Sequence, residues 1–310
     1  MNEASVRQLL DREAIDKFVA KELAPTLALL RELVDYGVAL IVKCVQSGGS
    51  LADLVVQGHF FKHAVTMLDA VEIQLSRGSV FAAGVSARSM LEAYIYLAWI
   101  LHTDTERRGR QFYVWHLRQK RGWQRRVIPG TDEYERFKKH ISSLSAMMGP
   151  KGFAALELEK EAKKKDGEIS SILTNMNNKA INDEFDRMKK RHFDVAWYNP
   201  SGPSSIGDMA RKLGLEAEYD LFYSQFSDIS HGGAFERHVK YDGRGVVFEP
   251  IRCPEEIRPL VNIVATLAFR ILRLMIAKYF PQDMESFADT YIREWQSRFL
   301  SVPEVVVEDP

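Results

Sequence analysis

The sequence predicts an all-α protein: a multi-helix bundle with one small β-hairpin and a charged helical insertion. Apolar residues recur every three or four positions along most of the 310 residues, which is the spacing of a helix with one buried face. Segments with this spacing begin at Ser, Asp or Pro and end at Gly, as helices commonly do. No Gly-rich phosphate loop follows a strand-like segment, which argues against a nucleotide-binding α/β domain.

The first half of the chain reads as consecutive helices with short breaks. Pro25 begins a helix that ends at the Gly48–Gly49 pair. Ser50 caps the next helix, which ends at Gly78, and another helix follows at once. The periodicity then predicts helices over residues 79–101, 106–127, 132–147 and 153–165.

The second half contains a polar break, further helices and the hairpin. Residues 166–182 are polar and poor in core residues, so we interpret them as a loop or mobile insertion. Asp242–Gly243, between extended apolar pairs, predicts a β-hairpin within residues 238–252. Helices are expected at residues 183–192, 206–213, 216–231, 255–280 and 283–300.

We assign these elements to a single helical domain over residues 1–310. Its parts are N-terminal helices, a core bundle made from two stretches of chain, a charged insertion and a loose tail. In that order they cover residues 1–49, 50–147 with 183–300, 148–182 and 301–310.

Composition and charge exclude several classes of protein. Hydrophobic residues make up 46% and charged residues 27% of the chain, which excludes a mostly disordered protein. Lys and Arg equal Asp and Glu at 42 each, so an electrostatic partner would have to be recognised by a local patch. Two cysteines are too few for a disulfide framework and fit a reducing cytoplasm.

Nothing in the sequence predicts a membrane partner. The charged N-terminal region is wrong for a signal peptide. The two most apolar stretches, residues 80–101 and 260–279, have charged residues such as Arg88 and Arg270 near their centres. Each such charge would cost roughly 3 kcal/mol to insert into a bilayer. We therefore expect buried helices and a cytoplasmic location.

The first candidate site is the segment Arg88-Ser89-Met90-Leu91-Glu92, inside an apolar helix. Arg88 and Glu92 are four residues apart and share one face of that helix. Buried charges need partners. The two side chains therefore form either a structural ion pair or half of a functional site.

The second candidate is a polar stripe at helical spacing, formed by Tyr219, Tyr223, Ser227 and His231. His231 ends the helix, where the helix dipole favours the imidazolium and raises its pKa. Both features have a simpler explanation as well. Tyrosines on a helix face are common in cores, and a histidine before Gly-Gly is often a helix cap.

These two segments resemble an uncharacterised family of all-helical bacterial proteins, catalogued as a domain of unknown function. That family has an Arg-Ser-x-Leu-Glu helix early and a Tyr-x3-Ser-x3-His-Gly helix late. The matching residues here are Arg88 with Glu92, and Tyr223, Ser227 and His231. The resemblance covers residues 64–277 and implies a bundle in which Arg88, Glu92 and His231 converge.

The expected fold is also similar to HEPN domains, many of which are metal-independent RNases with an Arg-x4-6-His motif at a dimer interface. The sequence has two such spacings, Arg110 to His116 and Arg187 to His192, no more than chance predicts from its arginine and histidine content. His231 has no arginine at those upstream positions. A second helix would have to supply the cation.

Under the HEPN resemblance the protein is a metal-independent endoribonuclease whose site is Arg88, Glu92, His231, Ser227 and Tyr223. Arg88 would neutralise phosphate, Glu92 would orient Arg88, and His231 would act as general base or acid on a ribose hydroxyl. A homodimer is expected, because a two-fold interface would bring two copies of this sparse site together. The apolar helices at residues 260–277 and 287–299 would either form that interface or close the bundle.

The third candidate is a basic stripe on the helix at residues 106–126. As a functional surface it would follow a phosphate backbone. As a structural one it would be a solvated face balanced by an acidic helix with Glu157, Glu159 and Glu161, which the zero net charge favours. On a helical wheel Phe112 and Trp123 lie well round from the stripe. The stripe consists of Arg107, Arg110, Arg118, Arg121 and Arg125.

A metal site has weaker support. His59 and His63 share a helix face and could bind a metal together with a carboxylate such as Asp228. The sequence has no Glu-x-x-His or His-Glu-x-x-His motif, and cysteine ligands are absent. We expect no metal and no cofactor.

The leading hypothesis is an intracellular bacterial HEPN-like protein that binds or cleaves RNA, in phage defence or a toxin system. A protein partner encoded in the same operon belongs to this hypothesis. The alternative is a non-catalytic interaction or sensor protein in which Arg88, Glu92 and His231 form a structural network. A pocket joining these residues to the basic stripe would favour the enzyme, and complete burial would favour the alternative.

Overall fold

The chain forms two compact units in the computed structural model. We call residues 1–103 together with 206–310 the bundle unit, and residues 104–205 the insert unit. The structure describes residues 9–46, 49–138, 140, 155–189, 195–223, 226, 227, 229, 233, 235, 238–241, 245–252 and 257–302.

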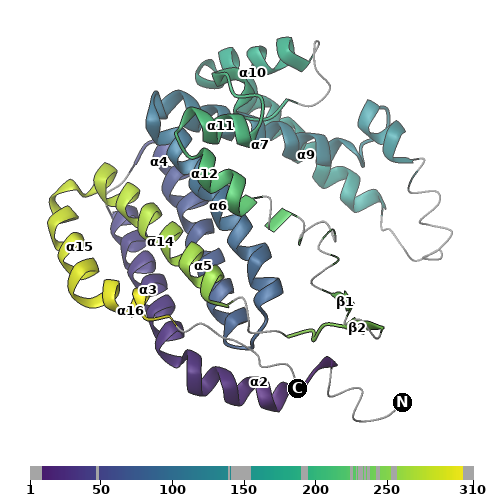
Figure 1. Ribbon diagram of the computed structural model, residues 1–310. Helices are drawn as coiled ribbons and strands as arrows, with labels where there is room; N and C mark the ends of the chain where they lie inside the picture. Colours follow the sequence, from purple (N-terminus) through teal and green to yellow (C-terminus); the bar gives the residue numbers. More distant parts are fainter. Residues whose placement is uncertain are drawn as a thin grey trace. The chain divides into compact units, whose positions relative to one another are not determined.

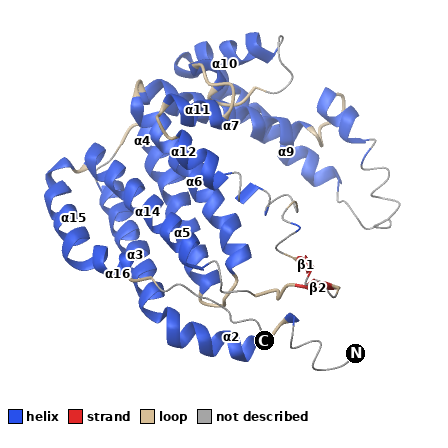
Figure 2. Ribbon diagram, in the orientation of Figure 1, coloured by secondary structure: helices blue, strands red, loops and turns tan. Residues whose placement is uncertain are grey.

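The all-α prediction is confirmed, since helices dominate the described residues of both units (Figure 1 and Figure 2). The insert unit contains α7 (Thr105–Arg125), α9 (Ala155–Thr174), α10 (Met176–Lys189) and η3 (Asn199–Ser201). The bundle unit contains α2 (Arg12–Phe18), η1 (Val19–Leu23), α3 (Ala24–Gln46), α4 (Leu51–Asp53), η2 (Leu54–Phe61), α5 (Lys62–Leu75), α6 (Val80–His102), α11 (Ile206–Lys212), α12 (Glu216–Glu218), η4 (Tyr219–Tyr223), α14 (Ile257–Tyr279), η6 (Pro281–Asp283), α15 (Met284–Thr290), η7 (Tyr291–Trp295) and α16 (Gln296–Leu300).

The core of the bundle unit is built around α6. This helix packs against α5 and α14, and α3 packs on the other side of α5 (Figure 1). Apolar residues cover α6 nearly all round, and Ala87, Leu91 and Ile95 are fully buried. Arg88 and Glu92 are therefore charged side chains on a core helix, as the sequence predicts.

The late helices close the bundle. By length and composition α14 could cross a membrane, but 56% of its most apolar window is buried inside the protein. Its contacts with α6, α5 and α3 are those of a core helix. Phe287 and Trp295, on α15 and η7, are buried and lie against Tyr36 of α3. These helices therefore close the bundle, and a dimer interface formed by them stays a prediction.

Two helix boundaries form as local signals predict. Ser50 caps α4 by exchanging hydrogen bonds with Asp53, each side chain accepting from the other's N–H. Gly78 ends α5 with a φ of +67°, a value that favours glycine. The N–H of Ser79 then donates to the carbonyl of Gln74, the long hydrogen bond of a Schellman motif.

The predicted hairpin is also confirmed. β1 (Val239–Tyr241) and β2 (Val246–Phe248) pair antiparallel, with Lys240 opposite Val247. The predicted turn residues, Asp242 and Gly243, lie outside the described part of the chain.

Residues 166–182 are helical except for Asn175, so their interpretation as a loop is wrong. They lie in α9 and α10, which pack on α7 through a small core. A helix that packs on one neighbour needs only a narrow apolar stripe, so most of its sequence stays polar. Residues 104–205 form a compact unit around this core. We had expected one domain with an insertion at residues 148–182. The core residues are Val114, Leu117, Ile169, Leu173, Ile181 and Phe185.

The buried cysteine Cys44 should be unreactive in the folded protein. It lies on α3 with 1% of its surface exposed. Burial, assisted by the Asp53 carboxylate, raises the pKa of its thiol to about 11. A raised pKa disfavours the reactive thiolate at every pH below that value. In a Cys253→Ser variant at pH near 8, we expect iodoacetamide to label Cys44 about 100-fold more slowly than in urea. Rapid labelling without urea would contradict this burial.

Candidate functional site

The Arg-Ser-Met-Leu-Glu segment lies in the middle of α6, and its charged pair has a third member. Arg88 donates from Nε to Glu92 Oε1 at 3.1 Å and from Nη2 to Tyr223 Oη at 2.8 Å. Arg88 is 15% exposed and Glu92 is 28% exposed. The ion pair within α6 is thus joined by a tyrosine that lies 135 residues further along the chain.

Tyr223 belongs to a stacked pair of tyrosines on η4. The rings of Tyr219 and Tyr223 are 4.5 Å apart and inclined by 17°. The guanidinium carbon of Arg88 is 4.6 Å from the centre of the Tyr223 ring. Burial lowers the pKa of Arg88, but the hydrogen bond to Tyr223 and the charge of Glu92 raise the pKa by more. The cluster therefore holds a permanent positive charge against an aromatic stack.

Ser89, the third polar residue of the segment, makes a hydrogen bond to a residue of α5. Its Oγ lies 2.8 Å from His63 Nε2 of α5. This contact gives one of the two predicted metal-binding histidines a hydrogen-bonding partner inside the bundle. No group of three His, Cys, Asp or Glu side chains among the described residues could hold a metal ion. Asp228 lies outside those residues.

The structure brings together Arg88, Glu92 and Tyr223 of the predicted site. Ser227 is described and half-buried. His231, the predicted base, lies outside the described residues, so its convergence with Arg88 stays a prediction.

In the insert unit, the five arginines of the basic stripe all contact polar groups of neighbouring segments. Arg118 donates to Asn182 Oδ1 at 2.6 Å and to Asp186 Oδ1 at 2.7 Å, both on α10. These contacts tie α7 to α9, to α10 and to the segment that follows α7. The other pairs are Arg107 with Glu184, Arg110 with Asn178, Arg121 with Asp166 and Arg125 with Glu133.

One expectation about this surface needs correction. The predicted acidic helix does not balance the stripe where it is described, because Glu159 and Glu161 pair with lysines one turn further along α9. The side chain of Glu157 lies outside the described residues. Trp123, on another side of α7, lines a pocket together with stripe arginines. Phe112, by contrast, is buried against Trp197.

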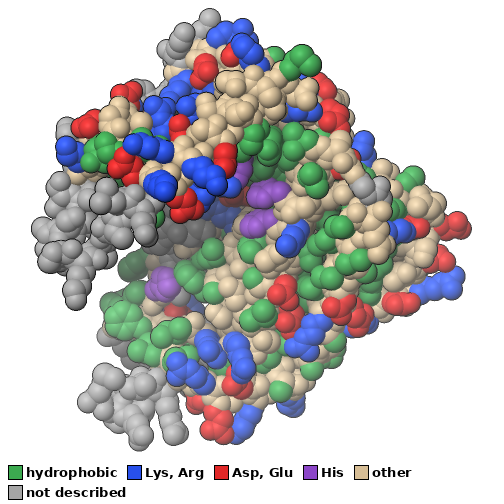
Figure 3. Space-filling view, turned by 180° about the vertical axis from the view of Figure 1, so that it is seen from behind, with side chains coloured by type: hydrophobic (Ala, Val, Ile, Leu, Met, Phe, Trp, Pro, Cys, Tyr) green, Lys and Arg blue, Asp and Glu red, His purple; other side chains and the backbone are tan. Residues whose placement is uncertain are grey.

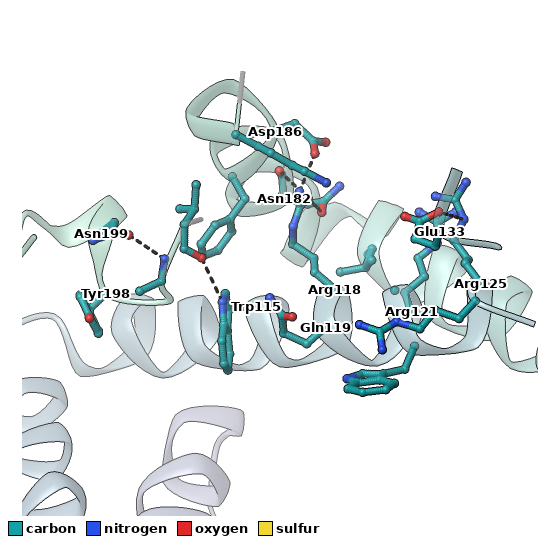
Figure 4. A pocket seen from close by; sticks show the side chains of 18 of the residues that line it. Trp115, Arg118, Gln119, Arg121, Arg125, Glu133, Asn182, Asp186, Tyr198 and Asn199 are labelled. Carbon is teal, nitrogen blue, oxygen red and sulfur yellow. Dashed lines mark hydrogen bonds and ion pairs between the residues drawn. The ribbon is translucent and has the colours of Figure 1, made fainter. Parts of the chain in front are cut away.

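That pocket has a volume of about 1020 Å³ and lies where the last turns of α7 meet α10 and residues 195–204. In Figure 4, Arg118, Arg121 and Arg125 project from α7, with Asp186 opposite Arg118 and Glu133 beside Arg125. The lining contains six basic side chains but only two carboxylates. The basic residues are Arg118, Arg121, Arg125, Arg126, Arg136 and Lys189.

The two carboxylates offset only two of these six charges, and Asp166 of α9 offsets that of Arg121. Both lining carboxylates are already paired with stripe arginines, at 2.7 and 3.4 Å. Arg136 and Lys189 are exposed, and neither has a carboxylate partner in the described part of the chain. Arg126 lies against aromatic rings, with its guanidinium carbon 3.7 Å from the centre of Trp123. The pocket is therefore electropositive.

The zero net charge of the chain conceals a difference between the units. Residues 104–205 contain 21 Lys and Arg against 14 Asp and Glu, a net charge of +7. The remaining residues contain 21 against 28, a net charge of −7. On the face shown in Figure 3, basic and acidic side chains are nevertheless interspersed. The pocket is thus a local concentration of positive charge, on a unit that is positive as a whole.

The fold and these sites define an all-helical protein with an Arg-Ser-x-Leu-Glu cluster in one unit and a basic pocket in the other. Residues 54–246 match DUF5677, a family of unknown function, and this match spans more than half of the chain, so the protein belongs to that family. No curated protein and no solved structure matches the chain.

Proposed function

We propose that this is an intracellular bacterial HEPN-like protein that binds RNA in the pocket of the insert unit. The observation that carries the proposal is the lining, which combines six basic side chains with aromatic rings and has both carboxylates already paired. Lys and Arg neutralise phosphates, and aromatic faces stack on bases, so nucleic acid fits both features. The HEPN resemblance favours RNA.

The ion pairs in the lining support this proposal. Arg121 and Arg125 contact their carboxylates through Nε. Their Nη groups have no hydrogen-bond acceptor among the described residues, so they remain available to a phosphate. An arginine that is already held in place loses little side-chain entropy when it binds a ligand.

Cleavage of bound RNA would be the task of Arg88, Glu92, Tyr223 and His231 in the bundle unit. One observation favours the non-catalytic alternative for this cluster: Arg88 is 15% exposed, and two of its nitrogens are taken up by Glu92 and Tyr223. We propose that the cluster holds η4 on α6. The homodimer, the operon-encoded partner and the role in phage defence or a toxin system stay predictions from the sequence.

The double variant Arg136→Glu/Lys189→Glu tests RNA binding. Both residues are exposed, so the variant should fold normally. Each phosphate contact with a single strand contributes about 0.7 to the slope of log affinity against log salt. We expect weaker binding and a slope reduced by about 1.4, measured by anisotropy of a labelled RNA from about 50 to 200 mM salt.

The matched control is Lys160→Glu/Lys164→Glu. These two lysines are exposed on α9, outside the pocket, and the control changes the net charge of the insert unit by the same amount. We expect its affinity to stay near that of the wild type. An equal loss in both variants would show attraction by net charge alone, and unchanged binding in the pocket variant would overturn the proposal.

A further inference from the structure

Trp123 stands out among the aromatic residues of the pocket. It is 60% exposed, whereas Phe185 is buried and Trp115 and Tyr198 are half-buried. Trp115 also donates a hydrogen bond from its indole N–H to the carbonyl of Val195. Trp123 is therefore the aromatic ring of the lining that offers most of its surface to a ligand.

The indole is held in place from one side. The guanidinium carbon of Arg126 lies 3.7 Å from the centre of the Trp123 ring and 5.5 Å from that of Phe137. The cation thus lies against both rings, and such contacts are attractive because the ring face is electron-rich. A ring with one face covered that keeps 60% of its surface exposed has its other face open.

An open, pre-positioned indole suits a planar ligand. A tryptophan side chain loses little conformational entropy on binding, and the contact with Arg126 already restricts the rotamers of Trp123. Nucleobases stack on such a face whatever their identity, since each base has a flat aromatic surface. Arg136 and Lys189 line the same pocket, are exposed and have no carboxylate partner among the described residues, so they suit the phosphates of the same strand.

We propose that Trp123 stacks on one unpaired base of the bound RNA, so that the pocket selects single strands over duplexes. The reason is steric. In an A-form duplex the bases are stacked on each other, and the deep, narrow major groove does not admit side chains. Only a base released from pairing can offer its face to the indole. This inference rests on the proposed function, because it assumes that RNA occupies the pocket.

The test compares Trp123→Ala and Trp123→Phe with the wild type. The ligands are a labelled oligoadenylate, the same strand paired with its complement, and a series carrying one abasic site. We expect Trp123→Ala to weaken single-strand binding by about 5- to 150-fold, the effect of losing one stacked base. Trp123→Phe, which keeps an aromatic face, should retain most of the affinity. Duplex binding should be weak and unaffected.

The abasic series separates stacking from a structural effect. In the wild type, removing the stacked base should weaken binding at one position, and in Trp123→Ala that removal should cost nothing further. If the wild type binds single strands and Trp123→Ala binds them equally well, the stacking proposal is wrong while RNA binding stands. If the wild type binds no RNA and Arg136→Glu/Lys189→Glu behaves like it, both proposals fall.

Discussion

Arg118→Glu is expected to destabilise the insert unit by about 3 kcal/mol, the largest effect predicted for one substitution. The Arg118 side chain is 20% exposed and donates to Asn182 and to the Asp186 carboxylate. A hydrogen bond to a charged group contributes about 1.5 to 3 kcal/mol, less where the partner is exposed, as Asp186 is. Glutamate at this position would also place two like charges side by side.

Urea unfolding followed by near-ultraviolet circular dichroism would measure this loss. Hydrogen exchange should at the same time show lower protection in α10, which Arg118 ties to α7. Arg136→Glu is the control, since it makes the same charge change at an exposed site with no carboxylate partner among the described residues. Its stability should stay within about 0.5 kcal/mol of that of the wild type. Equal stability of the two variants would show that the Arg118 contacts contribute little.

This result matters for the design of the binding experiment. A variant that reverses several stripe arginines would lose RNA binding because the unit unfolds, whatever those arginines contact. Arg136 and Lys189 avoid this ambiguity because they stabilise no described ion pair. The structure thereby separates the arginines that build the pocket from the cations that remain available to a ligand.

Arg88→Leu is expected to destabilise the bundle unit by about 2 to 3 kcal/mol. The change leaves the Glu92 carboxylate without its cation and the Tyr223 hydroxyl without its donor, and both atoms are only partly accessible to water. RNA binding should persist in conditions where the variant is folded, because the pocket belongs to the insert unit. Thermal and urea unfolding would measure the loss.

Two smaller variants test how the cluster is connected. Tyr223→Phe removes one acceptor of Arg88, and Glu92→Gln keeps an acceptor while removing the charge. In a double-mutant cycle, Arg88→Leu and Tyr223→Phe should show a coupling of about 1 kcal/mol, as hydrogen-bonded neighbours do. An Arg88→Leu protein that is as stable as the wild type but has lost an RNase activity would instead identify Arg88 as a catalytic residue.

Local sequence was sufficient to predict a structural feature wherever that feature depends on a contact between residues close together in the chain. The Ser50 cap joins residues three apart, and the bond that closes α5 at Gly78 joins residues five apart. The ion pair of Arg88 with Glu92 spans one helical turn. Such contacts depend on backbone geometry that every helix shares, so their spacing alone predicts them. The all-α class follows from the same periodicity.

The tertiary structure decided everything that depends on contacts distant in sequence. Tyr223 contacts Arg88 across 135 residues of sequence. In the basic stripe, Arg121 contacts Asp166, 45 residues away, and Arg107 contacts Glu184, 77 residues away. No periodicity encodes such pairings, because they depend on which faces pack together. The same packing shows that nearly all of residues 166–182 are helical, that the insert unit carries the net positive charge, and that Trp123 lines the basic pocket. Sequence by itself determined the all-α class, most of the helices and the charged pair on α6, whereas packing determined which charges remain available to a ligand.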